Sequence, residues 1–195
     1  MKKFMLAVVC VSVICTLSVW PAFAQKTRNS TNTYAPASDR DFLKKAMEAN
    51  TAEIELGKMA ESKSQDPGVK EFATMMVKDH SDALNRLRQA ASENNLSTSG
   101  VALSQQHQQL KNRLANLSGN EFDREYINAM VQDHQKDIKE FEAEANKTSA
   151  NTSSREKPAP VGTEAQPSAL ARDLLPTLKK HLAQAQSLQQ QMGKR

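Results

Sequence analysis

Apolar residues recur at intervals of three and four positions through most of the chain from Ser38 onward. No segment alternates apolar and polar residues as a half-buried strand does. The pattern predicts four long helices and one short helix, and four long amphipathic helices bury their apolar faces best as a bundle. We therefore expect an all-α fold in which residues 38–192 form one helical bundle domain.

Proline, glycine and polar residues mark the expected helix ends. Asp66-Pro67 should end the first helix and begin the second, because Asp caps helix N-termini and Pro suits the first helical position. Residues 148–167, rich in Ser, Thr, Pro and Ala, predict a flexible linker before the last helix, which Pro176 should kink. Gly57 lies inside the first helix, where a missing side chain lets another helix come close.

The N-terminus has the features of an export signal. Lys2 and Lys3 precede the apolar run 4–19, and Ala22-Phe23-Ala24 offers small residues to a signal peptidase. We expect residues 1–24 to be a signal peptide that is cleaved after Ala24 during export to the periplasm. No stop-transfer pattern follows, so no transmembrane anchor is expected after cleavage.

Composition excludes several classes of protein. Cys10 and Cys15 both lie in the signal peptide, so the mature chain has no thiol chemistry. Loss of Lys2 and Lys3 lowers the formal net charge from +4 to +2, and no basic stripe is interleaved with aromatic residues, so no nucleic-acid partner is expected. Residues 25–37 are polar and predict a disordered tail. The sequence contains neither a nucleophile elbow nor a glycine-rich phosphate loop, so these motifs give no support for an enzyme.

Four polar residues occupy inner positions, one on each long helix. The phrase Met-Val-x-Asp-His occurs at residues 76–80 and again at 130–134, and it places two histidines equivalently. The four inner polar residues are Glu53, His80, His134 and His181. A buried carboxylate requires a partner, so these side chains are expected to meet.

Two interpretations of this centre stay open. It forms a metal-free hydrogen-bond network, which burial alone favours, or it binds a transition metal (Fe, Zn or Cu) with these four residues as ligands. Asp79 and Asp133 point about 100° away from their adjacent histidines and would support a ligand on a neighbouring helix. Met76 and Met130, one turn before the histidines, would favour Cu(I). His107, on the short helix, is expected to be partly exposed.

Motifs in every long helix resemble those of a known family. The residues that carry the resemblance are Asn50 with Glu53-Ile54-Glu55-Leu56-Gly57, Val69-Lys70-Glu71-Phe72, residues 76–80, Leu117-Ser118-Gly119 with Phe122-Asp123-Arg124 and Tyr126, Asp133-His134, and Leu175-Pro176 with Leu178 and His181-Leu182. Over about residues 38–190 the chain resembles the ferritin-like envelope proteins called domain of unknown function 4142.

The resemblance implies a ferritin-like four-helix bundle, here with one short extra helix after the cleaved signal peptide. Members of this family are often described as outer-membrane or exported proteins. Di-iron proteins of ferritin-like fold use Glu-x-x-His pairs on two helices. In this chain the corresponding positions hold Asp-His pairs, and only Glu53 supplies an inner glutamate, which weakens the case for a di-iron centre.

We therefore expect an exported periplasmic helical bundle of unknown role, non-enzymatic and acting in the envelope, including under stress. The alternative is a ferritin-like protein that binds a transition metal in the Glu/His centre. A third hypothesis is a module that binds an envelope protein or itself through polar helix faces or the basic end, Lys194-Arg195.

Overall fold

Five helices make up the residues that this computed structural model describes, which are 37–151 and 166–194. They are α1 (Ala37–Lys63), α2 (Pro67–Glu93), α3 (Gln105–Ala115), α4 (Gly119–Asn151) and α5 (Pro167–Met192). These ranges contain no strand, which confirms the all-α prediction. Within them, no helix is both long enough and apolar enough to cross a membrane.

Three predicted segments lie wholly or mostly outside the described residues. They are the signal peptide (1–24), the tail (25–37) and the linker (148–167), of which the structure describes only the ends. α1 begins at Ala37, α4 continues to Asn151, and α5 begins at Pro167.

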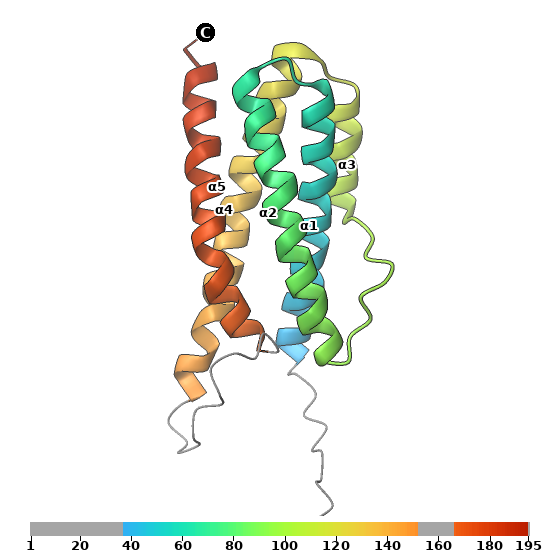
Figure 1. Ribbon diagram of the computed structural model, residues 1–195, viewed down its shortest axis with the longest axis vertical. Coiled ribbons are helices and arrows are strands. Elements are labelled where there is room, and N and C mark those ends of the chain that lie inside the picture. The colour runs from blue at the N-terminus through green and yellow to red at the C-terminus, as the bar shows by residue number, and fades with distance from the viewer. Residues whose placement is uncertain (1–36, 152–165, 195) are drawn as a thin grey trace, which may run out of the picture. The chain divides into compact units, whose positions relative to one another are not determined.

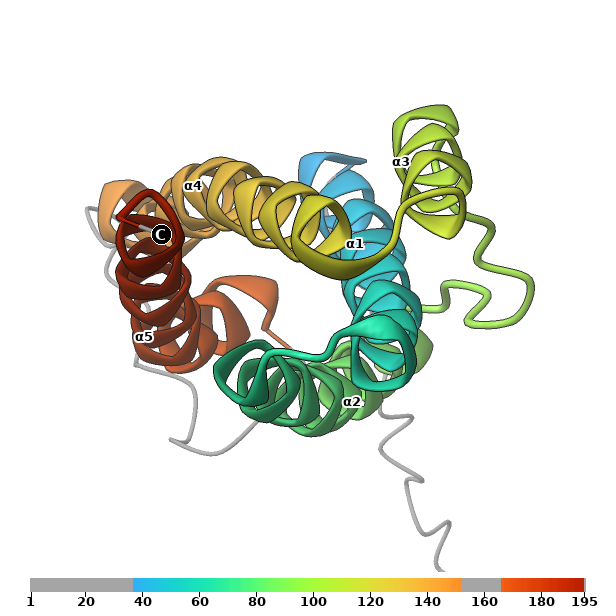
Figure 2. The same ribbon diagram turned by 90° about the horizontal axis from the view of Figure 1, so that it is seen from above.

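The four long helices form a ring, and α3 lies outside it (Figures 1 and 2). α1 packs chiefly against α2, and α4 against α5, while contacts of α1 with α4 and of α2 with α5 close the ring. A short turn makes α1 and α2 antiparallel. The connection from α2 to α4 includes α3 and runs back along the bundle, so α2 and α4 run in the same direction (Figure 1). One long crossover of this kind is typical of ferritin-like bundles.

The turn between α1 and α2 is built by the residues that predicted it. Asp66 is the N-cap of α2: its Oδ1 accepts hydrogen bonds from the backbone N–H groups of Gly68 (2.8 Å) and Val69 (3.2 Å). Pro67 occupies the first helical position, where its missing N–H costs nothing. Pro176 lies inside α5, and Figure 1 shows the first turns of that helix inclined to the rest.

Two apolar clusters fill the ring, one toward each end of the bundle. The first contains Phe42, Leu43, Leu84, Leu87, Ile138, Phe141, Leu170 and Leu174, among others. The second contains Leu56, Val69, Phe72, Met76, Phe122, Tyr126, Ile127, Met130 and Ala185, among others. Along each long helix, the inner polar residue falls between the members of the first cluster and those of the second, so one polar layer separates the two.

Polar contacts fasten α3 to the outside of α1 and α4. Glu48 Oε1 of α1 accepts hydrogen bonds from the backbone N–H of Ser104 (2.7 Å) and from His107 Nδ1 (2.7 Å). On its other side, His107 Nε2 lies 3.8 Å from Asp133 Oδ2 of α4. His107 is only 5% exposed, so the prediction of partial exposure was wrong: the helix is held against two carboxylates.

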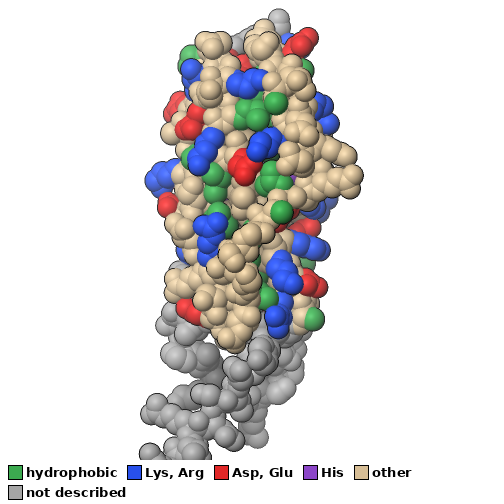
Figure 3. All heavy atoms as spheres, turned by 90° about the vertical axis from the view of Figure 1, so that its right-hand side faces the viewer, with side chains coloured by type: hydrophobic (Ala, Val, Ile, Leu, Met, Phe, Trp, Pro, Cys, Tyr) green, Lys and Arg blue, Asp and Glu red, His purple; other side chains and the backbone are tan. Residues whose placement is uncertain are grey.

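Charges of both signs cover the α3 side of the bundle. Lys111 Nζ pairs with Glu55 Oε2 at 2.7 Å, which adds a second tie between α3 and α1. Figure 3 views the molecule from this side and shows Lys and Arg side chains spread among acidic and hydrophobic ones. On this face, basic side chains do not gather into one stripe. The absence of a nucleic-acid partner stays a prediction.

Gly57 brings α1 close to α2. A Cβ atom at this position would lie 2.8 Å from Val77 Cγ2 and 3.4 Å from the Ala73 carbonyl oxygen. We expect Gly57→Ala to lower the free energy of unfolding by about 1–2 kcal/mol, because overpacking outweighs the helix-propensity gain of about 1 kcal/mol. Urea unfolding with a chelator present measures it. In a Val77→Ala background the same change should be neutral or stabilising; equal effects in both backgrounds would contradict the steric cause.

His107 makes the attachment of α3 depend on pH. Asp133 and Glu48 raise the pKa of His107 to about 9, although burial opposes this. At 3.8 Å the Asp133 contact is electrostatic, so Glu48 is the partner for a variant to remove. The pKa of His107 is higher in the folded protein than its ordinary value near 6.5. Protonated His107 therefore stabilises the folded state fully below pH 6.5, and this stabilisation is lost as the pH rises through 9.

The stability difference between wild type and Glu48→Gln should therefore be largest below pH 6.5, at most about 3 kcal/mol, and shrink toward pH 9. Chemical unfolding across this pH range, in chelator, measures it. Glu55→Gln is the matched control on the same helix, because Glu55 pairs with a lysine of α3. A difference that stays constant from pH 6 to pH 10 would refute the role of His107.

Candidate metal centre

The polar layer brings the four predicted residues together. Glu53 lies on α1, His80 on α2, His134 on α4 and His181 on α5. Each of these side chains is at most 2% exposed. The two apolar clusters lie on either side of this layer and shield it from water.

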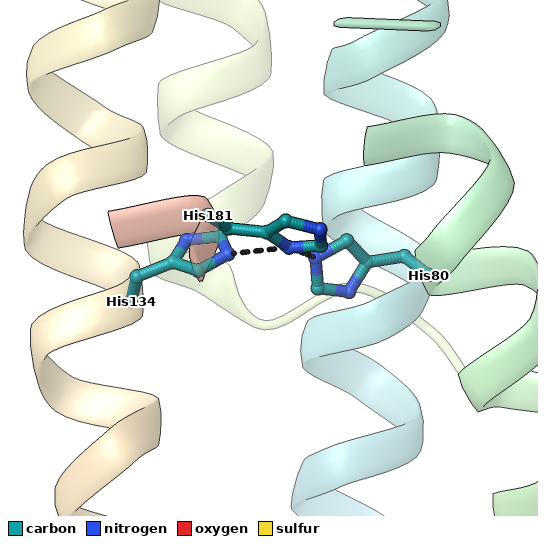
Figure 4. Close-up of side chains that lie close together, drawn as sticks. All are labelled: His80, His134 and His181. Carbon is teal, nitrogen blue, oxygen red and sulfur yellow. Dashed lines mark hydrogen bonds between the residues drawn. The ribbon is translucent and has the colours of Figure 1, made fainter. Parts of the chain in front are cut away.

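Three imidazole rings point toward one another at the centre of the layer (Figure 4). His181 Nδ1 lies 3.2 Å from His80 Nε2 and 3.3 Å from His134 Nε2. The three nitrogens lie within 4.8 Å of one another, and no other His, Cys, Asp or Glu of the described residues joins this group. Three helices thus each supply one inward nitrogen.

The outward nitrogen of His80 faces an acceptor of fixed orientation. Asn50 Nδ2 donates to the carbonyl oxygen of Ala46 at 2.7 Å, which fixes the side-chain amide. Asn50 Oδ1 therefore faces His80 Nδ1 at 3.0 Å and accepts from it. Since Oδ1 can only accept, Nδ1 carries the proton. Asn50 was missed as a site residue, although its position one turn before Glu53 could have indicated it.

The outward nitrogens of the other two rings also face acceptors. His134 Nδ1 donates to the carbonyl oxygen of Met130 at 2.9 Å. His181 Nε2 donates to Asp79 Oδ2 at 3.1 Å, so the aspartate of one helix supports a histidine of a neighbouring helix. All three rings therefore hold their protons on the outside.

In a neutral imidazole, the nitrogen without the proton carries a lone pair. Three lone pairs therefore converge on one point, which is unfavourable unless a proton or a cation lies between them. Burial lowers the pKa of His134. Burial, with the nearby ring of His80, lowers the pKa of His181 to about 4. A proton on either of these two rings is thus disfavoured at neutral pH.

Glu53 lies outside the triangle of inward nitrogens. Its Oε2 is 2.9 Å from His80 Nδ1 and its Oε1 is 3.2 Å from His134 Nδ1. Neither contact has hydrogen-bond geometry, so both are electrostatic. Burial alone would raise the pKa of Glu53, but attraction to His80 and then His134 lowers it to about 2. Glu53 is therefore stable as a buried anion only when positive charge lies among the rings.

Asp133 does not reach this layer. It is directed toward His107 of α3, although it occupies the same place in its phrase as Asp79. Asp137, one turn after His134, was not predicted from the sequence. It is buried, and burial together with the charge of Glu53 raises its pKa to about 8. This acid therefore keeps its proton at neutral pH.

Comparison with known proteins adds the family and the fold. Residues 24–154 match the family model described as Domain of unknown function (DUF4142), a range that includes Glu53, His80 and His134 and ends before His181. No curated protein matches the chain.

Two crystal structures have a similar fold at 12% sequence identity. A DUF305 protein from Streptomyces coelicolor, described as secreted, gives a TM-score of 0.61 over 80% of this chain and 94% of its own. A DUF305 fragment from Deinococcus radiodurans gives 0.60 over 82% and 98%. The family match confirms the resemblance seen in the helix motifs: the chain belongs to the DUF4142 family of domains of unknown function.

Proposed function

We propose that this protein is an exported helical bundle that binds one divalent transition-metal ion through His80, His134 and His181. The observation that carries the proposal is the convergence of three imidazole nitrogens whose protons are held on the opposite side of each ring. Histidine ligands in metal sites typically donate the other ring N–H to a carbonyl or carboxylate, which fixes the tautomer in this way.

The spacing of the nitrogens fits a metal ion. Two imidazole nitrogens bound to zinc at 2.0–2.1 Å with tetrahedral angles lie about 3.3–3.4 Å apart. The two contacts of His181 Nδ1, at 3.2 and 3.3 Å, are close to this value. Neutral imidazole suits zinc, copper and iron. Met76 and Met130 pack in the second apolar cluster, so nothing in their placement adds support for Cu(I).

Charge also supports a dication. Glu53 and Asp79 both lie beside ligand rings, and the neighbouring histidines lower the pKa of each carboxyl although burial opposes this. Two carboxylates would balance a divalent ion held by three neutral rings. We assign Glu53 to this supporting position and not to direct coordination, because its oxygens face the outward nitrogens.

A metal-free network satisfies the centre less well. One protonated ring could donate its inward N–H to a second ring, but the third lone pair would then remain without a partner. The geometry therefore favours the metal over the network that burial alone suggested.

Export rests on the N-terminal residues and on the fold shared with a protein described as secreted. We place the mature protein in the periplasm, with a role in the envelope, including under stress, that follows from this address and from the family.

We expect cleavage after Ala24. Intact mass of the protein isolated from the periplasm measures it, and a mass that retains residues 1–24 would refute the assignment.

The purified protein should bind one zinc or cobalt ion per chain, and each of His80→Ala, His134→Ala and His181→Ala should weaken binding by at least about 100-fold. Calorimetric titration and metal analysis of protein purified without chelator measure this. His107→Ala is the matched control, since it removes the histidine outside the centre. No metal in wild type, together with unchanged stability when metal is added, would refute the proposal.

The supporting carboxylates allow a graded form of the same measurement. Asp79→Asn and Glu53→Gln should each weaken metal binding by about 10–100-fold, because they remove the charge but not the ligands. Asp82→Asn is matched to Asp79→Asn: both residues pair with Lys78, but Asp82 is exposed and does not reach a ring.

A further inference from the structure

A small cavity lies where the turn between α1 and α2 meets the start of α4 and the end of α5. Its volume is about 20 Å³, and it is lined by Asp66, Asn120, Asp123, Arg124 and Met192. Such a volume exceeds the roughly 10–15 Å³ that one water molecule needs. Asn120 and Arg124 are exposed, so the cavity opens to solvent beside α4. It shares no residue with the polar layer and has room for one small ion.

Asp123 brings a buried oxygen without a partner to this lining. The residue is only 3% exposed, and its Oδ1 has no hydrogen-bond partner. A buried carboxylate oxygen in this condition lowers the stability of the fold. Burial raises the pKa of Asp123; a hydrogen bond with Ser64 opposes this rise, and the charge of Asp66 adds to it. A proton on Oδ1, or a cation beside it, would satisfy this carboxyl group.

The other groups of the lining suit a cation with a preference for oxygen. Asp66, which caps α2 through its Oδ1, adds a second carboxylate, and Asn120 adds an amide oxygen. Arg124 adds one positive charge, but it is exposed and its Nη2 donates to the carbonyl oxygen of Met192 at 3.2 Å. The five lining residues thus include two carboxylates, one guanidinium, and no imidazole or thiolate. Carboxylate and amide oxygens are ligands for calcium more than for zinc or copper.

We propose that this cavity binds one calcium ion through Asp123 Oδ1, with Asp66 and Asn120 beside it and water molecules completing the coordination. Calcium takes about six to eight oxygen ligands in irregular geometry, whereas magnesium requires a near-octahedral arrangement. Since the protein supplies few of these ligands, binding should be weak, with a Kd of about 10⁻⁴–10⁻³ M. The ion would connect the turn between α1 and α2 to the start of α4, independently of the histidine centre.

Terbium(III), a luminescent substitute for calcium, gives a direct test, because a nearby tyrosine sensitises its emission. Tyr126 lies one turn after Asp123 on α4, and the only other tyrosine of the chain is Tyr34. Emission excited through tyrosine should appear in wild type, decrease as calcium is added, and persist in Tyr34→Phe. Asp123→Asn should weaken terbium and calcium binding by at least about tenfold, because it removes the charge of the ligand. Asp82→Asn, which removes an exposed carboxylate of α2, is the matched control.

The outcomes distinguish a bound ion from a protonated acid or a water molecule in the cavity. Emission that is absent from wild type, or undiminished in Asp123→Asn, overturns the calcium site. Emission that persists in Tyr126→Phe and disappears in Tyr34→Phe comes from another place in the chain and also overturns it. Asn120→Ala, at an exposed position, should weaken binding as well, and it decides the question if Asp123→Asn does not fold. His80→Ala should keep the emission, so this site and the histidine centre fail or succeed separately.

Discussion

The buried charge of Glu53 is the constraint on which the bundle depends. An ion removed from water costs several kcal/mol even after the protein relaxes, unless neighbouring groups compensate it. Glu53 is 1% exposed, and its closest polar neighbours are two imidazole rings. Each long helix contributes one residue to this polar layer. The apolar clusters on both sides can therefore pack fully only if the buried polar atoms of the layer have partners. Positive charge among the rings, supplied by a metal, would meet that requirement.

The sequence predicted the fold well because helical periodicity is a local property. The inner faces of α1 and α4, read from intervals of three and four residues, are the faces that the structure buries. The cap at Asp66 and the close approach at Gly57 were also predictable, since each depends on one residue type at one position. The four inner polar residues were found in the same way.

The partners of those residues were harder to predict, because periodicity gives the direction of a side chain but not the neighbour it meets. The repeated phrase shows this. Asp79 and Asp133 hold equivalent places, yet Asp79 contacts His181 of α5 and Asp133 lies toward His107 of α3. α3 packs beside α1 and α4, and among the described helices it has no equivalent beside α2. The asymmetry arises from the crossover, which no local pattern records.

The polar layer also defines the alignment of the helices along their axes. Apolar side chains of similar size can exchange neighbours when one helix slides past another, so two apolar clusters alone would tolerate a shift. A slip of one turn would move a ring by about 5.4 Å and leave its nitrogen without a partner. α5 follows a long connection, and His181 is the only buried ionisable residue on it. The position of that single ring therefore distinguishes the correct axial position of the last helix from positions one turn away.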